Sequence, residues 1–87
     1  MKLALTEHFI DRWRQRICKP VPPPSFIRHL LRHPHTLRLQ KGRRLLTPEG
    51  VECNTLTIYY YTPAGLLLFI DHYNQTAVTV MTAVGRN

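Results

Sequence analysis

Acidic residues are scarce in this chain, which has five aspartates and glutamates against twelve lysines and arginines. The formal net charge is therefore +7, and the isoelectric point is about 10.1. Nine of the twelve cations are arginines, whose planar guanidinium suits phosphate groups better than the lysine ammonium does. The charge balance predicts nucleic acid as the partner, with solubility or an acidic partner protein as the alternative explanations.

Cysteines and long apolar runs are scarce as well. Cys18 and Cys53 lie far apart and form no Cys-x-x-Cys motif, which argues against a disulfide framework or a zinc ribbon and predicts free thiols. No apolar run approaches the ~18 residues of a membrane span, and the apolar stretch in residues 1–5 is too short for a signal peptide. We therefore expect a cytoplasmic protein that does not contact a membrane.

The chain also lacks the length for two domains and the low-complexity composition of a disordered protein. With 87 residues, of which 44% are hydrophobic, it is predicted to fold as a single domain over residues 1–87. The core of so small a domain is limited, so that a partner or a second copy would add stability.

A strong helical pattern covers residues 6–17. Thr6 is a preferred N-cap residue, and one arc of the helix is apolar, formed by Phe9, Ile10, Trp13 and Ile17. The opposite arc places His8, Arg12 and Arg16 at i, i+4 and i+8. One titratable base beside two permanent cations is typical of phosphate handling, so we expect this face to meet solvent or a ligand.

The rest of the chain predicts a connector, a second helix and a run of strands. Prolines interrupt residues 19–24, apolar residues at helical spacing follow at 26–33, and Pro34 supplies the stop. The strand segments are 36–40, 55–62, 66–73 and 77–84, with a turn at 42–44 leading into 45–47 and further turns at 48–50, 63–65 and 74–76.

This order of elements predicts an α+β fold, in which two N-terminal helices pack on one face of a four-stranded antiparallel meander. Residues 2–5 can add a short N-terminal edge strand. In the segment 55–62 the side chains alternate, so that Leu56, Ile58 and Tyr60 face one way and Thr57, Tyr59 and Tyr61 face the other. The second face is aromatic with polar tips and is a candidate binding surface, where Tyr59 and Tyr61 could stack on bases or simply fill the strand.

Three histidines near the second helix suggest a metal site at first sight. His29 and His33 stand at i and i+4, a spacing that can chelate zinc, and His35 follows. No fourth ligand lies nearby, and Arg28 and Arg32 on the same helix disfavour a bound cation. We therefore expect neither a metal site nor a cofactor.

The first helix also resembles a known family. Small RelE-like proteins open with the pattern His-Ala-x-x-Arg-Met-x-x-Arg-Gly-Ile, and here His8, Arg12 and Arg16 fall on its polar positions. Trp13 replaces the usual small hydrophobe, and the glycine before Ile17 is missing. The chain thus resembles the RelE/ParE-type toxins.

Beyond the helix the resemblance is one of organisation and extends over nearly the whole chain. It rests on His33-Pro34 after the second helix, on Gly42-Arg43-Arg44, and on Thr82 in the last strand. The resemblance implies a barnase/RelE-like ribonuclease fold, RNA as the substrate, and an acidic antitoxin protein that covers the face formed by His8, Arg12 and Arg16.

Metal-independent ribonucleases need a base for the ribose 2′-hydroxyl, an acid for the leaving oxygen, and cations for the charge on the phosphate. His8, Arg12 and His72 are the candidate catalytic residues, with His72 as the reserve histidine at the end of a strand. A helix-surface role for His8 and a strand-end role for His72 are the alternatives. The candidate nucleic-acid-binding residues are Arg12, Arg16, Arg43, Arg44, Tyr59 and Tyr61.

The leading interpretation is a RelE-like toxin-module protein that binds RNA and cleaves it by 2′-hydroxyl attack without a metal. Two alternatives from other classes stay open. One is a non-catalytic module of the same fold that binds nucleic acid or protein. The other is a structural subunit whose aromatic sheet face forms a homodimer.

Overall fold

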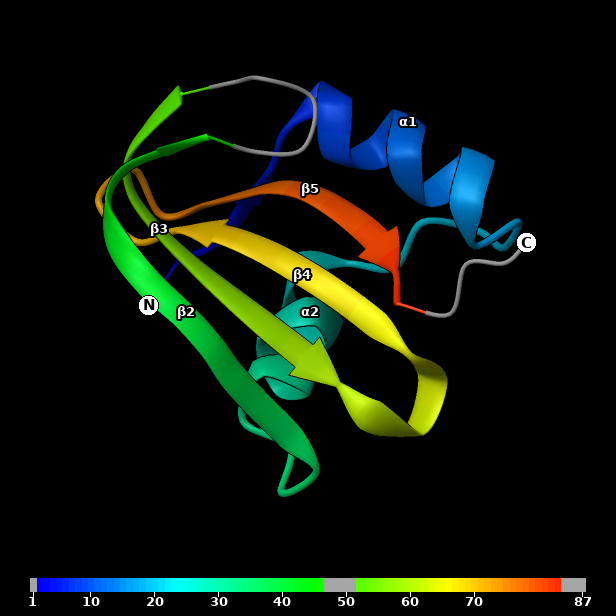
Figure 1. Ribbon diagram of the computed structural model, residues 1–87. Coiled ribbons are helices and arrows are strands. Elements are labelled where there is room, and N and C mark those ends of the chain that lie inside the picture. The colour runs from blue at the N-terminus through cyan, green and yellow to red at the C-terminus, as the bar shows by residue number, and fades with distance from the viewer. Residues whose placement is uncertain (1, 47–51, 84–87) are drawn as a thin grey trace.

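The computed structural model describes residues 2–46 and 52–83, with backbone alone described at 40–46 and 52–54. Two helices and five strands make up the fold, together with one 3-10 turn (Figure 1). In chain order they are β1 (Ala4–Leu5), α1 (Glu7–Arg16), α2 (Pro24–Leu31), β2 (Thr36–Leu46), β3 (Glu52–Tyr61), η1 (Thr62–Ala64), β4 (Leu66–Asp71) and β5 (Thr76–Thr82). The α+β class predicted from the order of patterns is confirmed.

The sheet has the strand order β1-β5-β4-β3-β2 and is mixed. Strands β2 to β5 form the predicted antiparallel meander, whereas β1 pairs in parallel with β5. The predicted four-stranded antiparallel meander is present but is not the whole sheet, because the short N-terminal edge strand that the sequence allowed adds a fifth strand in parallel. The backbone amide of Ala4 donates to the carbonyl of Gln75 at 2.9 Å, which secures this fifth strand.

Strand β2 also differs from its prediction, because no turn interrupts it at residues 42–44. Gly42 pairs with Leu56 and Arg43 with Thr55, and a register shift occurs earlier, between Arg38 and Gln40. Gly42, Arg43 and Arg44 suggest a turn when they are considered without their neighbours. Their backbone stays extended because β2 pairs with β3 along this segment. The predicted turn at 48–50 lies outside the described residues.

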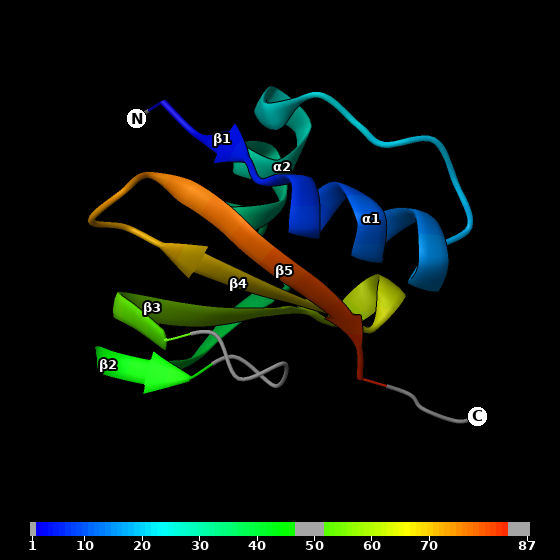
Figure 2. The same cartoon turned by 90° about the horizontal axis from the view of Figure 1, so that it is seen from above.

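Helix α1 begins as the sequence predicts. The Thr6 side chain accepts a hydrogen bond from the backbone amide of Phe9 at 2.9 Å, and Glu7 lies in the first turn. After the helix, Cys18 adopts a left-handed conformation with φ of 59°, and the connector arches across to α2 (Figure 2). Both helices cover the same face of the sheet, with α1 against β5 and α2 over β3.

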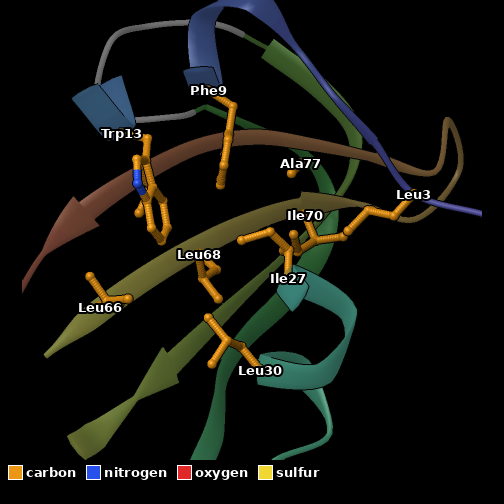
Figure 3. Close-up of a cluster of buried hydrophobic side chains, with 10 residues drawn as sticks. Leu3, Phe9, Trp13, Ile27, Leu30, Leu66, Leu68, Ile70 and Ala77 are labelled. Carbon is orange, nitrogen blue, oxygen red and sulfur yellow. The ribbon is translucent and has the colours of Figure 1, made fainter. Parts of the chain in front are cut away.

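The main core lies between the helices and the sheet (Figure 3). The rings of Phe9 and Trp13 stack with their centroids 6.0 Å apart. Burying each such side chain contributes about 1.5–3 kcal/mol. The buried members are Leu3, Phe9, Trp13, Ile27, Leu30, Leu66, Leu68, Ile70, Ala77 and Val80.

The tyrosine face of β3 is the face that the helices cover. Tyr59 and Tyr61 are half-buried and pack against the main core, while Leu56, Phe69 and Val78 form a second cluster on the opposite face. The alternation along β3 is confirmed, but the interpretation of the tyrosine face as the open one is wrong. Strand β4 is apolar on both faces, so alternation alone could not show which face the helices occupy.

Candidate nucleic-acid interface

Side chains at the two ends of helix α1 hydrogen-bond to the edge of β5. The Thr6 hydroxyl donates to the carbonyls of Ala77 and Val78 at 3.2 and 3.1 Å, and Nη1 of Arg16 donates to the carbonyl of Val80 at 2.9 Å. Strand β1 pairs only with the start of β5, so these side chains satisfy carbonyls along the remaining edge. Arg16 therefore has a structural role at this edge, whether or not it also binds a ligand.

His8 and Arg12 are half-buried rather than fully exposed on this helix. Nη1 of Arg12 donates to Oε1 of Gln15 at 3.1 Å, and the Nε2 atom of His8 is shielded from solvent. The predicted i, i+4, i+8 arrangement is present, since all three residues lie on α1. The face meets solvent only in part, because α1 packs on β5.

A second histidine has a sharply defined partner. The phenol oxygen of Tyr59 on β3 lies 2.8 Å from Nε2 of His72, which follows β4. Arg38 on β2 is the register partner of Tyr59, so both side chains project from the same face of the sheet. Arg38, Tyr59 and His72 will be called the Tyr59/His72 cluster.

The phenol in this cluster is held in its protonated form. Burial raises the pKa of Tyr59, and the positive charge of Arg38 offsets only part of that effect. A neutral His72 either accepts the phenol proton at Nε2 and carries its own proton at Nδ1, or carries its proton at Nε2 and donates it to the phenol oxygen, as a protonated His72 also does. The hydrogen bond thus joins a phenol and an imidazole, and Arg38 lies on the same face of the sheet.

The Asp71 carboxylate shapes the turn that presents His72. Oδ1 accepts from the Thr55 hydroxyl and from the backbone amides of Tyr73 and Asn74, and Oδ2 accepts from the Asn74 side chain, all at 2.9–3.1 Å. Burial by itself would raise the pKa of Asp71, but these hydrogen bonds hold it below its ordinary value. Asp71 is therefore an ionised structural anchor beside the cluster.

Two of the predicted binding residues line a common groove. Arg16 and Tyr61 meet there with Lys19 and Phe26, between the two helices and the ends of β3, β4 and β5. The ring of His33 contacts Tyr61 edge-on, with centroids 5.1 Å apart. This groove and the Tyr59/His72 cluster both use tyrosines of the helix-covered face of β3.

The three-histidine segment carries no metal geometry. His33 accepts a hydrogen bond at Nδ1 from the backbone amide of His35 at 3.1 Å, and its ring contacts those of His29 and His35. Within residues 2–46 and 52–83, no group of three or more potential ligands is arranged to hold a metal ion. In the same described part of the chain, no helix has the length and apolarity of a membrane span.

The predicted site residues thus separate into three places. His8 and Arg12 lie on α1, Arg16 and Tyr61 lie at the groove, and Tyr59 meets His72 on the other side of β4 from β5. Arg43 and Arg44 belong to β2, but their side chains lie outside the described residues.

Sequence reasoning missed Arg38, Lys19 and Phe26. Arg38 could be found only from the strand register, which a single sequence does not reveal. Lys19 and Phe26 flank the proline-rich connector at the positions where it leaves α1 and enters α2. A cation before the proline-rich connector and an aromatic residue after it could have suggested that both line one binding groove.

Comparison with protein-family models, with curated proteins and with solved structures finds no match to this chain. The function is therefore argued from the geometry of its own residues.

Proposed function

We propose that the protein binds RNA and cleaves it without a metal ion, as the toxin of a RelE-like toxin–antitoxin module. The observation that carries the catalytic part is the 2.8 Å hydrogen bond between the Tyr59 phenol and Nε2 of His72, beside Arg38. The binding part is supported by the net charge of +7 and by the groove that contains Arg16 and Lys19. The resemblance of α1 to the RelE-like pattern supports the toxin class independently of this cluster.

In the proposed reaction, His72 donates from Nε2–H to the Tyr59 oxygen and takes the proton of a ribose 2′-hydroxyl at Nδ1, and the 2′-oxygen attacks the neighbouring phosphorus. The bond from phosphorus to the 5′-oxygen breaks, and the Tyr59 phenol protonates the leaving oxygen. Arg38 stabilises the charge that gathers on the phosphate. His72 then passes its Nε2 proton to the Tyr59 oxygen through their hydrogen bond, and proton exchange with water returns the imidazole to its starting tautomer.

His8 and Arg12 are the alternative catalytic pair. They lie on α1, apart from the Tyr59/His72 cluster, and variants therefore distinguish the two sites. His8 is half-buried and Arg12 donates to Gln15, which favours a helix-supporting role. If the double variant His8→Ala, Arg12→Ala still cleaves RNA, the catalytic residues do not lie on α1.

The test is cleavage of a single-stranded RNA in the presence of a chelator, together with growth after induced expression. Wild type is expected to cleave and to arrest growth, and His72→Ala or Tyr59→Phe to relieve both. Tyr73→Phe and His29→Ala are the matched controls, because both residues are exposed and neither belongs to the cluster. Intact RNA and normal growth with wild-type protein would refute the toxin proposal.

The non-catalytic alternative keeps RNA binding and drops turnover. It is favoured by the same groove, which needs no proton transfer to hold a nucleic acid. Salt-sensitive RNA binding with the RNA recovered intact would support it.

An acidic antitoxin remains the proposed protein partner. The scarcity of acidic residues in this chain makes a basic surface that such a partner would neutralise. The homodimer alternative would have to use the face of Tyr59 and Tyr61, on which both helices also pack, so it is the less favoured one. A monomer by light scattering at micromolar concentration is the expected result.

A further inference from the structure

The groove between the helices has a volume of about 920 Å³ and opens to solvent. Trp13 and Arg16 of α1 form one side, Phe26 of α2 forms the other, and Tyr61 and Leu66 form the floor. Its volume lies in the range of about 300–1,000 Å³ that is typical of sites for single compact ligands. The volume therefore fits one compact ligand.

The wall of the groove is rigid before any ligand arrives. The indole Nε1 of Trp13 donates to the carbonyl of Pro20 at 3.1 Å, which ties the proline-rich connector to α1. Pro22 and Pro23 continue this wall with restricted backbone torsions. A preformed wall lowers the entropy that binding has to overcome.

The chemistry of the lining is aromatic and cationic. Trp13, Phe26 and Tyr61 contribute three rings, and Phe26 is 43% exposed. Among the described residues that line the groove, the two charged ones are Arg16 and Lys19, both positive, and none is acidic. The bond from Arg16 to Val80 fixes the guanidinium at the groove, and the hydroxyls of Ser25 and Thr82 supply polar contacts.

We propose that this groove binds one nucleotide of single-stranded RNA, with the base against Phe26 and Tyr61 and the phosphate at Arg16 and Lys19. Bases stack on aromatic side chains in single-strand-binding proteins, and cations next to them hold the backbone. An acidic peptide would use the same cations but has no need of three rings around a compact space. The identity of the ligand rests on the proposed function, whereas the site is separate from the Tyr59/His72 cluster.

Trp13 makes the groove directly measurable, because it is the single tryptophan of the chain. The experiment is a titration of its fluorescence with a short single-stranded RNA that is 2′-O-methylated throughout. This probe cannot be cleaved, because the attacking hydroxyl is blocked. Wild type is expected to show a saturable change in Trp13 fluorescence that weakens as salt is raised.

Two variants test the two halves of the ligand. Phe26→Ala should weaken binding by about tenfold or more, as loss of one stacked base does. Lys19→Gln should weaken it and reduce the slope of log affinity against log salt by about 0.7, the value for one single-strand phosphate contact. Tyr73→Ala and Lys2→Gln, an exposed aromatic residue and an exposed cation outside the groove, should bind as wild type does.

The outcomes separate this site from the catalytic proposal. If His72→Ala abolishes cleavage but leaves the Trp13 titration unchanged, both proposals stand. If wild type cleaves RNA and Phe26→Ala binds and cleaves equally well, the groove proposal is overturned alone. Saturation of the Trp13 signal by an acidic amphipathic peptide, with no response to RNA, would also overturn it and assign the groove to a protein partner.

Discussion

The polar arc of α1 and the Tyr59/His72 cluster are both arrangements of a histidine with arginine, yet they differ in how they arise and in what they contact. On α1 the spacing of His8, Arg12 and Arg16 guarantees proximity, but Arg16 donates to β5 and the arc is half-buried. The Tyr59/His72 cluster joins residues of different elements through one 2.8 Å hydrogen bond. A regular spacing can therefore serve packing, while a pairing unseen in the sequence can offer the better proton-transfer geometry.

The largest expected effect separates the two histidines in RNA cleavage. His72→Ala should lower the cleavage rate by about 10²–10⁴-fold, the usual contribution of a general acid or base. His8→Ala should retain the wild-type rate within about threefold, because it removes no group that transfers a proton in the proposed reaction. Initial cleavage rates on one RNA substrate measure both effects. A larger loss of rate for His8→Ala than for His72→Ala would show that the catalytic site is on α1.

A smaller effect is expected on the free energy of unfolding when the anchor of the His72 turn is removed. Asp71→Ala deletes the acceptor of hydrogen bonds from Thr55, Tyr73 and Asn74, and should cost about 2–3 kcal/mol. Urea denaturation gives this value. A cost as small as that of an exposed substitution would show that the turn is held by other contacts.

The same carboxylate predicts a pH dependence of stability. The pKa of Asp71 is lower in the folded protein than its unfolded value of about 3.9, so the unfolded state binds the proton more readily. The stabilisation is therefore complete above about pH 5 and is lost as the pH falls through the lowered folded pKa. Asp71→Asn should flatten the fall in unfolding free energy between pH 5 and pH 2, whereas an unchanged pH profile would contradict the assignment.

The N-cap of α1 should have an effect of about 1–2 kcal/mol. Thr6→Ala removes the acceptor of the Phe9 amide and the donor to the carbonyls of Ala77 and Val78. Thermal unfolding measures the loss. Thr6→Ser keeps the hydroxyl and serves as the matched control, which should remain within about 0.5 kcal/mol of wild type.

The smallest effect concerns the arginine that caps the β5 edge. Arg16→Met keeps the aliphatic part of the side chain, removes the donor to the Val80 carbonyl, and should cost about 1 kcal/mol. Arg14→Met on the exposed side of the same helix is the control and should change the free energy of unfolding by less than about 0.5 kcal/mol. Equal effects for the two variants would remove the structural role assigned to Arg16.

Much of the secondary structure was readable from local chemistry. Thr6 caps α1 as predicted, prolines keep the connector out of the helices, and the turn around Gly65 joins β3 to β4 with a positive φ of 64°. These features depend on neighbouring residues only. The continuity of β2 through Gly42 was not readable, because it depends on hydrogen bonds to a strand that follows later in the chain.

The candidate site was readable only in part. His8, Arg12 and Arg16 share α1 because helical periodicity fixes their spacing. The contact of Tyr59 with His72 spans 13 residues and depends on the register of β3 and β4 and on the turn held by Asp71. No local pattern encodes that register.

The charge, the α+β order of elements, the capped first helix and the alternation along β3 could all be derived from the amino-acid sequence. Those properties follow from composition and from the fixed periods of helix and strand. Three features could be known only from the folded chain: which face of the sheet the helices cover, the bond of Arg16 to the β5 edge, and the contact of Tyr59 with His72. A two-sided apolar sheet has two ways to bury itself, and the choice depends on packing between residues that are distant in the chain.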